Sequence, residues 1–211
     1  MTKKQRVALC VAALEKEYPD AICSLVYEDP LQLIIAVRLS AQCTDERVNK
    51  VTPALFEKYP DLESFCNAEV EDIERLIYSC GFYKTKAKDI KEMAIMIRDV
   101  FGGRVPDSIE KLTSLPGVGR KTANLIMGDV YKQPAIVADT HLIRITNLIG
   151  LVETKDPKKV EIELKKIVEG DKSNDFCHRM VLHGRAVCIA RRPQCHKCCI
   201  KDYCKTGSKK Q

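Results

Sequence analysis

Five of the chain's 11 cysteines stand close together between residues 188 and 204 of its 211 residues. Four of them follow the spacing C-x6-C-x2-C-x5-C, as Cys188, Cys195, Cys198 and Cys204, and Cys199 adds a fifth thiol beside the third. A random distribution would place about one cysteine in this stretch, so the clustering indicates a metal site. Thiolates are soft ligands, and four of them on a short segment can hold either a tetrahedral zinc ion or an iron–sulfur cluster.

The spacing of these four cysteines favours the cluster over zinc. Structural zinc sites usually pair their ligands as two C-x2–4-C units separated by a longer insert. Here only one C-x2-C unit exists, at Cys195 and Cys198, and all four ligands lie in one short segment. An iron–sulfur cluster is therefore predicted, with zinc as the alternative.

Charge and composition describe a globular protein with a basic end. Hydrophobic residues make up 45% of the chain, and the net charge is +6. From residue 191 to the end, Asp202 is the single acid among seven basic residues: Arg191, Arg192, Lys197, Lys201, Lys205, Lys209 and Lys210. Such a tail favours an anionic partner such as nucleic acid, although a merely solvated terminus is the alternative.

The N-terminus and the scattered cysteines indicate a cytosolic protein. Lys3, Lys4 and Arg6 precede an apolar run, but charged residues follow at once without a cleavage site, so an amphipathic helix is expected. No apolar run approaches the ~20 residues that a membrane span requires. The total of 11 cysteines is odd, and six of them lie in helix-like segments, which favours thiols in a reducing compartment. We expect a monomer in the cytoplasm, associated with the nucleoid.

Helical periodicity and helix punctuation run along nearly the whole sequence. Asp29 and Pro30 predict one helix start, Thr44 predicts the next, and Asp107 is expected to cap a short helix that ends at Ser114. Further helices are expected at about 69–80, 84–101, 120–131, 139–150, 157–169 and 174–190. The predicted fold class is all-α.

Residues 112–123, LTSLPGVGRKTA, form the second strong motif. Gly117 and Gly119 flank Val118, so the backbone can turn sharply and present amide groups at the N-terminus of the next helix, where the dipole favours an anion. With Leu112 and Leu115 facing inward, the segment matches a helix-hairpin-helix module, which grips the DNA backbone without reading sequence. An ordinary helix–helix turn is the alternative. The candidate DNA contacts here are Pro116, Gly117, Val118, Gly119 and Arg120.

Lys121 follows this turn and has two possible roles. It could hold a phosphate, or it could act as an amine nucleophile. An ordinary lysine has a pKa near 10.4, so efficient attack needs a pKa lower by about 2–3 pH units, which a helix N-terminus, Arg120 and burial would favour. Asp139 is the carboxylate expected to act with it, although the simplest role of Asp139 is to cap the helix at 139–150.

These motifs together resemble the endonuclease III family, bifunctional DNA glycosylases and abasic-site lyases of base excision repair. The resemblance rests on residues 115–124, on Val-Ala-Asp-Thr-His at 137–141 and on the cysteine spacing, with support from residues 40–45 and 182–185. It implies a two-lobed fold, with a six-helix barrel at 23–133 that carries the hairpin. A second domain of 1–22 and 134–211 would carry a [4Fe–4S] cluster on Cys188, Cys195, Cys198 and Cys204, and the lesion pocket would lie between the lobes.

The resemblance also implies residue roles and a substrate. Lys121 would attack C1′ of an oxidised pyrimidine nucleoside in double-stranded DNA, or of an abasic site, and Asp139 would assist base departure. Gln42 would fill the space left by the flipped nucleotide, and Phe82 would act as a wedge, although alone it would be taken for a core residue. Arg191 and Arg192 would contact phosphates.

Two departures and three alternatives accompany the resemblance. Arg38 replaces an expected apolar residue, and Cys199 lies outside the family spacing. Adenine-mismatch glycosylases carry a glutamate where this chain has Ala36, and they and thymine-mismatch relatives lack the lysine. A non-enzymatic iron–sulfur module that binds DNA, or a ferredoxin-type carrier, would have no use for Lys121 with Asp139.

Overall fold

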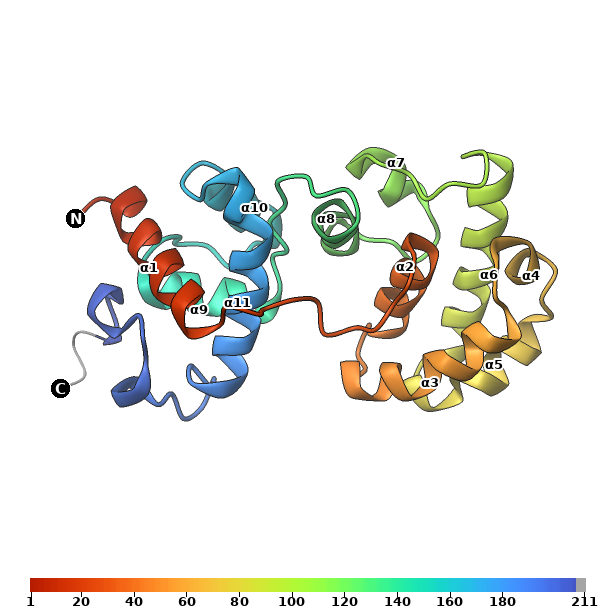
Figure 1. Ribbon diagram of the computed structural model, residues 1–211, viewed down its shortest axis with the longest axis horizontal. Coiled ribbons are helices and arrows are strands. Elements are labelled where there is room, and N and C mark those ends of the chain that lie inside the picture. Colours follow the sequence, from red (N-terminus) through yellow and green to blue (C-terminus); the bar gives the residue numbers. More distant parts are fainter. Residues whose placement is uncertain (208–211) are drawn as a thin grey trace. The chain divides into compact units, whose positions relative to one another are not determined.

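The computed structural model describes residues 1–207, which form two compact units (Figure 1). The first unit joins Met1–Cys23 to the chain from Lys132 onward, and the second unit is Ser24–Tyr131. The described residues contain helices and no strand, which confirms the all-α prediction. None of the helices in residues 1–207 has the length and apolar character that crossing a membrane would require. Lys209 and Lys210 of the predicted basic tail lie outside the described residues.

In the second unit, α2 (Pro30–Leu39) is the central helix. Leu33, Ile34, Ile35 and Ala36 follow one another on it, and all four are fully buried. A helix that is apolar on every side needs neighbours all round, and α2 contacts α3 (Asp45–Lys58), α6 (Tyr83–Asp99) and α8 (Arg120–Asp129). The other elements of this unit are α4 (Leu62–Cys66), α5 (Val70–Ile77), the 3-10 turn η1 (Tyr78–Cys80) and α7 (Ile109–Ser114).

Helix starts follow the predicted caps with one exception. Asp29 accepts a hydrogen bond from the Gln32 amide at 2.8 Å, and Thr44 accepts one from the Arg47 amide at 3.2 Å. The prediction that Asp107 caps α7 is wrong, because Ser108 has the extended backbone of a cap and accepts from the Lys111 amide at 3.3 Å. The short helix α4 was not predicted from the sequence.

In the first unit, α11 (Ser173–Ala186) packs against both α1 (Lys3–Glu17) and α9 (Thr140–Ile149). Phe176 and Met180 of α11 are fully buried. The short turn η4 (Lys201–Tyr203) contacts α1, so the N-terminal helix and the C-terminal cysteine segment lie side by side (Figure 1). The remaining elements are α10 (Pro157–Lys165) and the 3-10 turns η2 (Gly170–Lys172) and η3 (Cys195–Lys197).

Candidate functional site

The predicted hairpin consists of α7, a tight turn and α8. Leu112, Leu115 and Val118 are buried, as predicted, and the Val118 amide donates to the Leu115 carbonyl at 3.1 Å, which closes the turn. Gly119 is the N-cap of α8 and is exposed. Because a glycine cap has no side chain to occupy the first amide groups of the helix, they face solvent at the positive end of the helix dipole. The geometry suits a phosphate oxygen.

Gly117 is required at its position for two reasons. Its φ of +72° is a left-handed conformation that side chains rarely adopt. A Cβ atom there would lie 2.6 Å from Arg38 Cδ and 2.7 Å from Asp89 Oδ2, so the turn rests directly on these two side chains.

Arg38, unexpected on this otherwise apolar helix, has a carboxylate partner. Its Nε donates to Asp89 Oδ2 at 2.7 Å, and its Nη2 lies 2.6 Å from the same oxygen. The side chains are only 14% and 18% exposed, so the pair is a mostly buried ion pair between α2 and α6. The sequence showed Arg38 as a departure from an apolar position but gave no sign of its partner.

Lys121 lies in the first turn of α8, and its side chain is exposed. Its amine therefore stands next to the amide groups that can hold a phosphate. Burial was expected to help activate this lysine, but in this unit the chain around it leaves it open to solvent.

Asp139 is the N-cap of α9, as predicted. Its backbone is extended, and its Oδ1 accepts from the Leu142 amide at 2.7 Å. The side chain is half-buried, so the cap fixes a carboxylate that still reaches solvent. Asp139 belongs to the first unit, whereas Lys121 belongs to the second.

Gln42 and Phe82 share an unusual backbone conformation. Their φ values are +53° and +48°, and Lys132 is the one other non-glycine residue with positive φ among residues 1–207. Such conformations are uncommon away from glycine and often mark functional positions. Both side chains are exposed, and the 66% exposure of Phe82 excludes the alternative that it belongs to the core.

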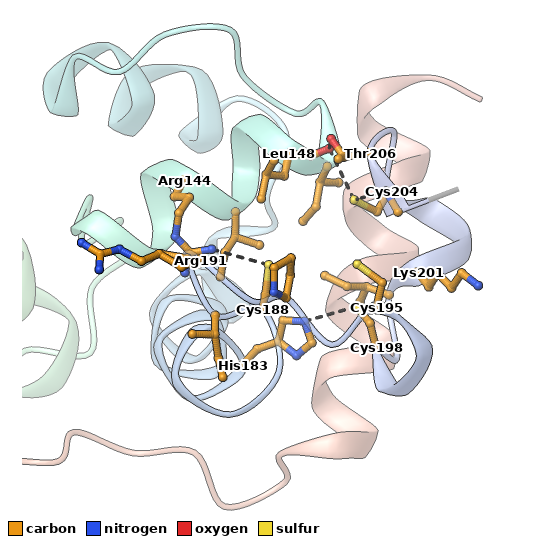
Figure 2. A pocket seen from close by; sticks show the side chains of 17 residues that line it. Arg144, Leu148, His183, Cys188, Arg191, Cys195, Cys198, Lys201, Cys204 and Thr206 are labelled. Carbon is orange, nitrogen blue, oxygen red and sulfur yellow. Dashed lines mark hydrogen bonds between the residues drawn. The ribbon is translucent and has the colours of Figure 1, made fainter. Parts of the chain in front are cut away.

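The four spaced cysteines line one cavity of about 260 Å³ (Figure 2). Cys188 follows α11, Cys195 begins η3, and Cys198 and Cys204 follow η3 and η4. Cys199 is not among the lining residues. Within residues 1–207, no three histidine, cysteine, aspartate or glutamate side chains converge closely enough to hold a single metal ion. The thiols therefore surround a space instead of meeting at a point.

Polar groups next to this cavity interact with the sulfur atoms. Arg144 Nη1 donates to Cys188 Sγ at 3.6 Å, and the Gly207 amide donates to Cys204 Sγ at 3.2 Å. These donors suit thiolate ligands, whose negative charge they offset. Burial raises the pKa of the Cys198 thiol to about 12, so a positively charged centre is needed to hold that sulfur as a thiolate.

His183 is a residue of this site that the sequence reading missed. The four histidines were treated as capping or packing residues, but His183 lies on the cavity wall, with Nε2 3.3 Å from Cys198 Sγ (Figure 2). Its Nδ1 lies 3.1 Å from the Tyr18 hydroxyl. Burial lowers the pKa of His183 to about 4, so the ring is neutral at physiological pH. The position of His183 five residues before Cys188 was the available signal.

Arg191 and Arg192 lie on the segment between Cys188 and Cys195, and both are exposed. Arg191 extends away from the thiols (Figure 2). The segment therefore presents two cations to solvent, while its ends are fixed at the cavity.

Comparisons with known proteins agree with this geometry. A family described as HhH-GPD superfamily base excision DNA repair protein matches residues 35–170. The chain is 44% identical to endonuclease III of Synechocystis sp., over 96% of this chain and 93% of that protein. It is 35% identical to endonuclease III of Escherichia coli K12, over 99% of both chains.

Solved structures give the same result. The structure of a trapped endonuclease III–DNA covalent intermediate, an estranged-adenine complex, has a TM-score of 0.92 and 41% identity, and the match covers 99% of both chains. A thermostable thymine-DNA glycosylase has a TM-score of 0.88 at 23% identity, a likeness that concerns the fold alone.

Proposed function

Because the chain belongs to the endonuclease III family of HhH-GPD base excision repair proteins, and is therefore a DNA glycosylase and abasic-site lyase, we propose that Lys121 is its nucleophile. We propose oxidised pyrimidines in double-stranded DNA as its substrates and Asp139 as the assisting carboxylate. The observation that carries the assignment is the exposed amine of Lys121 in the first turn of α8, directly after a turn built to hold phosphate.

The reaction begins outside the base stack. A glycosidic bond is inaccessible inside a duplex, so the damaged nucleotide must be flipped out, which costs least for a damaged or mispaired base. The neutral amine of Lys121 then forms a bond to C1′ while the bond from C1′ to the base breaks, and the base leaves with a proton. Opening of the sugar ring gives a Schiff base between Lys121 and C1′.

The Schiff base makes the second step possible. It acidifies the proton on C2′, and when that proton leaves, the bond from C3′ to its phosphate oxygen breaks. The strand is thus cut on the 3′ side of the lesion. Asp139 is suited to proton transfer in these steps, because the cap to Leu142 holds its carboxylate in a fixed position.

The DNA backbone would be held mainly by charge and by amide groups. The hairpin turn offers amides to a phosphate, and Arg191 and Arg192 offer exposed cations. Gln42 and Phe82 would enter the duplex at the opened position, a role that their exposure and their left-handed backbones support.

Cys188, Cys195, Cys198 and Cys204 would hold a [4Fe–4S] cluster. The fit is supported by four thiols that surround a cavity of about 260 Å³ and by the donors on Cys188 and Cys204. When bound, the cluster would crosslink residues 188–204 and so shape the segment that carries Arg191 and Arg192. A single zinc ion would need the thiols to converge, which requires a rearrangement of the segment.

Borohydride trapping tests the proposed nucleophile. Wild-type protein on a duplex that contains thymine glycol should give a covalent protein–DNA band, because hydride reduces the imine to a stable amine. Lys121→Gln should lose the band while it retains DNA binding. Lys88→Gln is the matched control, because Lys88 is exposed and lies in the same unit. A band from Lys121→Gln at the wild-type rate would show that another amine is the nucleophile.

A further inference from the structure

Lys86 of α6 is fully buried, and it is the one lysine enclosed in this way among residues 1–207. Lysine almost never occurs in a protein interior without a partner, because removal of an ammonium from water is costly. Burial lowers the pKa of Lys86 below its ordinary value, while the neighbouring thiols of Cys43 and Cys80 oppose that shift. The position therefore demands an explanation in terms of its partners.

The two printed partners of the ammonium are backbone carbonyl groups. Nζ donates to the Leu39 carbonyl at 2.8 Å and to the Cys80 carbonyl at 2.7 Å. Leu39 is the last residue of α2, and Cys80 is the last residue of η1. Carbonyl groups at helix ends lack a partner within the helix and carry negative partial charge, so a cation there is favoured. One ammonium thus joins the ends of two helical segments.

The chain leaves both of these ends toward the two left-handed residues. Gln42 stands three residues after Leu39, with φ +53°. Phe82 stands two residues after Cys80, with φ +48°, and its carbonyl accepts from the Lys86 amide at 3.1 Å. Lys86 therefore holds the Phe82 segment with its backbone and both segments with its side chain.

We propose that Lys86 is a positioning residue, which keeps the Gln42 and Phe82 segments in a fixed relation so that both can enter the duplex at one opened position. The inference rests on the proposed roles of Gln42 and Phe82. Strained backbones persist where the surrounding structure fixes them, and two insertions at one base-pair step require a constant spacing. An apolar side chain of equal length would leave two enclosed carbonyl groups without their donor.

Two substrates separate positioning from general stability. Lys86→Met keeps the length and removes the donors, and Lys88→Met is the control, since Lys88 is exposed on the same helix. We expect base release from a thymine glycol duplex to fall about 100-fold in Lys86→Met, because loss of placement far from the chemistry has effects of this size. Cleavage of a single-stranded oligonucleotide with a preformed abasic site should stay close to wild type, because no duplex has to be opened. Lys88→Met should match wild type on both substrates.

Loss of both activities in equal proportion, or of neither, would overturn the positioning role. Lys86→Gln carries the same comparison should the methionine variant fail to fold, because its amide keeps one donor. Lys86→Arg, which retains charge and donors, should recover part of the duplex activity.

A third comparison separates this inference from the function it rests on. In a Gln42→Ala/Phe82→Ala background, Lys86→Met should cause little further loss of duplex activity, because coupled residues are not additive. If Gln42→Ala and Phe82→Ala leave base release unchanged, the proposed roles of those two residues fail. If these two variants lose duplex activity but Lys86→Met adds its full effect to theirs, the link through Lys86 fails.

Discussion

The hairpin at residues 109–129 and the cysteine segment at residues 188–207 are both assigned to DNA binding, but they are held in opposite ways. The hairpin has a buried apolar face and rests on the ion pair of Arg38 with Asp89. In the cysteine segment, Ile200 and Gly207 are the two buried residues, and its regular structure consists of the short 3-10 turns η3 and η4. Ordinary packing is therefore sufficient for the first region and insufficient for the second.

This difference indicates what each region needs in order to bind phosphate. In the hairpin, protein packing alone presents the amide groups of α8, so the surface is complete once the chain folds. In the cysteine segment, the four thiols around one cavity are the main fixed points that a bound centre could use. Arg191 and Arg192 would then be placed by metal ligation and the hairpin by side-chain packing.

The largest expected effect is loss of a cluster ligand. Cys198→Ser should remove the colour and most of the about four iron atoms expected per chain. It should also lower the thermal stability of the first unit, because metal binding and folding of such segments are coupled. Iron analysis and thermal unfolding measure these effects. Cys199→Ser is the matched control and should retain the iron, since Cys199 does not line the cavity. Stoichiometric zinc without iron in the wild type would contradict the cluster assignment.

A smaller effect is expected in the hairpin from Gly117→Ala. The new methyl group would meet Arg38 and Asp89, and φ +72° disfavours alanine. We expect a loss of about 1–3 kcal/mol in the free energy of unfolding, together with weaker binding of all duplexes. Urea unfolding and fluorescence anisotropy measure the two effects. Gly119→Ala is the control, because a Cβ there meets nothing within 4 Å and its φ lies outside the left-handed region. Equal losses in both variants would mean that the ion pair does not support the turn.

The ion pair itself gives the next effect. Asp89→Leu leaves the mostly buried guanidinium of Arg38 without its carboxylate, so we expect a loss of about 1–3 kcal/mol. Arg38→Leu combined with Asp89→Leu should be less destabilised than Asp89→Leu alone, because no unpaired charge remains. Chemical denaturation of the single and double variants tests this order. A double variant that equals the sum of both single losses would show that the residues are not coupled.

The smallest expected effect concerns Arg192, which is exposed and changes binding without a change in stability. Each phosphate contact contributes about −0.9 to the slope of log K against log salt, so Arg192→Glu should flatten the slope by about one unit. Lesion and undamaged duplexes should weaken alike. A loss confined to lesion DNA would indicate that Arg192 acts at the lesion and not on the backbone.

Local signals in the sequence predicted much of the fold and the candidate site. The caps Asp29, Thr44 and Asp139 were readable because each needs only its own helix start. The helix α4 was missed because five residues are too few to show a period, and Ser108 was missed because Asp107 beside it is an equally good cap in sequence terms.

The parts that could not be predicted depend on contacts between distant residues. Lys86 lies on an amphipathic helix, where sequence alone places a lysine at the surface, and its carbonyl partner Leu39 is 47 residues away. The partner of Arg38 is 51 residues away, and Arg144 meets Cys188 across 44 residues. No local pattern encodes such pairs, since the packing of α2, α6, α9 and α11 brings them together.

The central claim, that an amine at the start of α8 forms the covalent bond to DNA, is tested most directly by the site of the trapped adduct. The borohydride-reduced complex would be digested with nuclease and protease, and its peptides sequenced by mass spectrometry. We predict that the sugar remnant is attached to Lys121. An adduct on any other lysine or on the N-terminal amine, with Lys121 unmodified, would contradict the account.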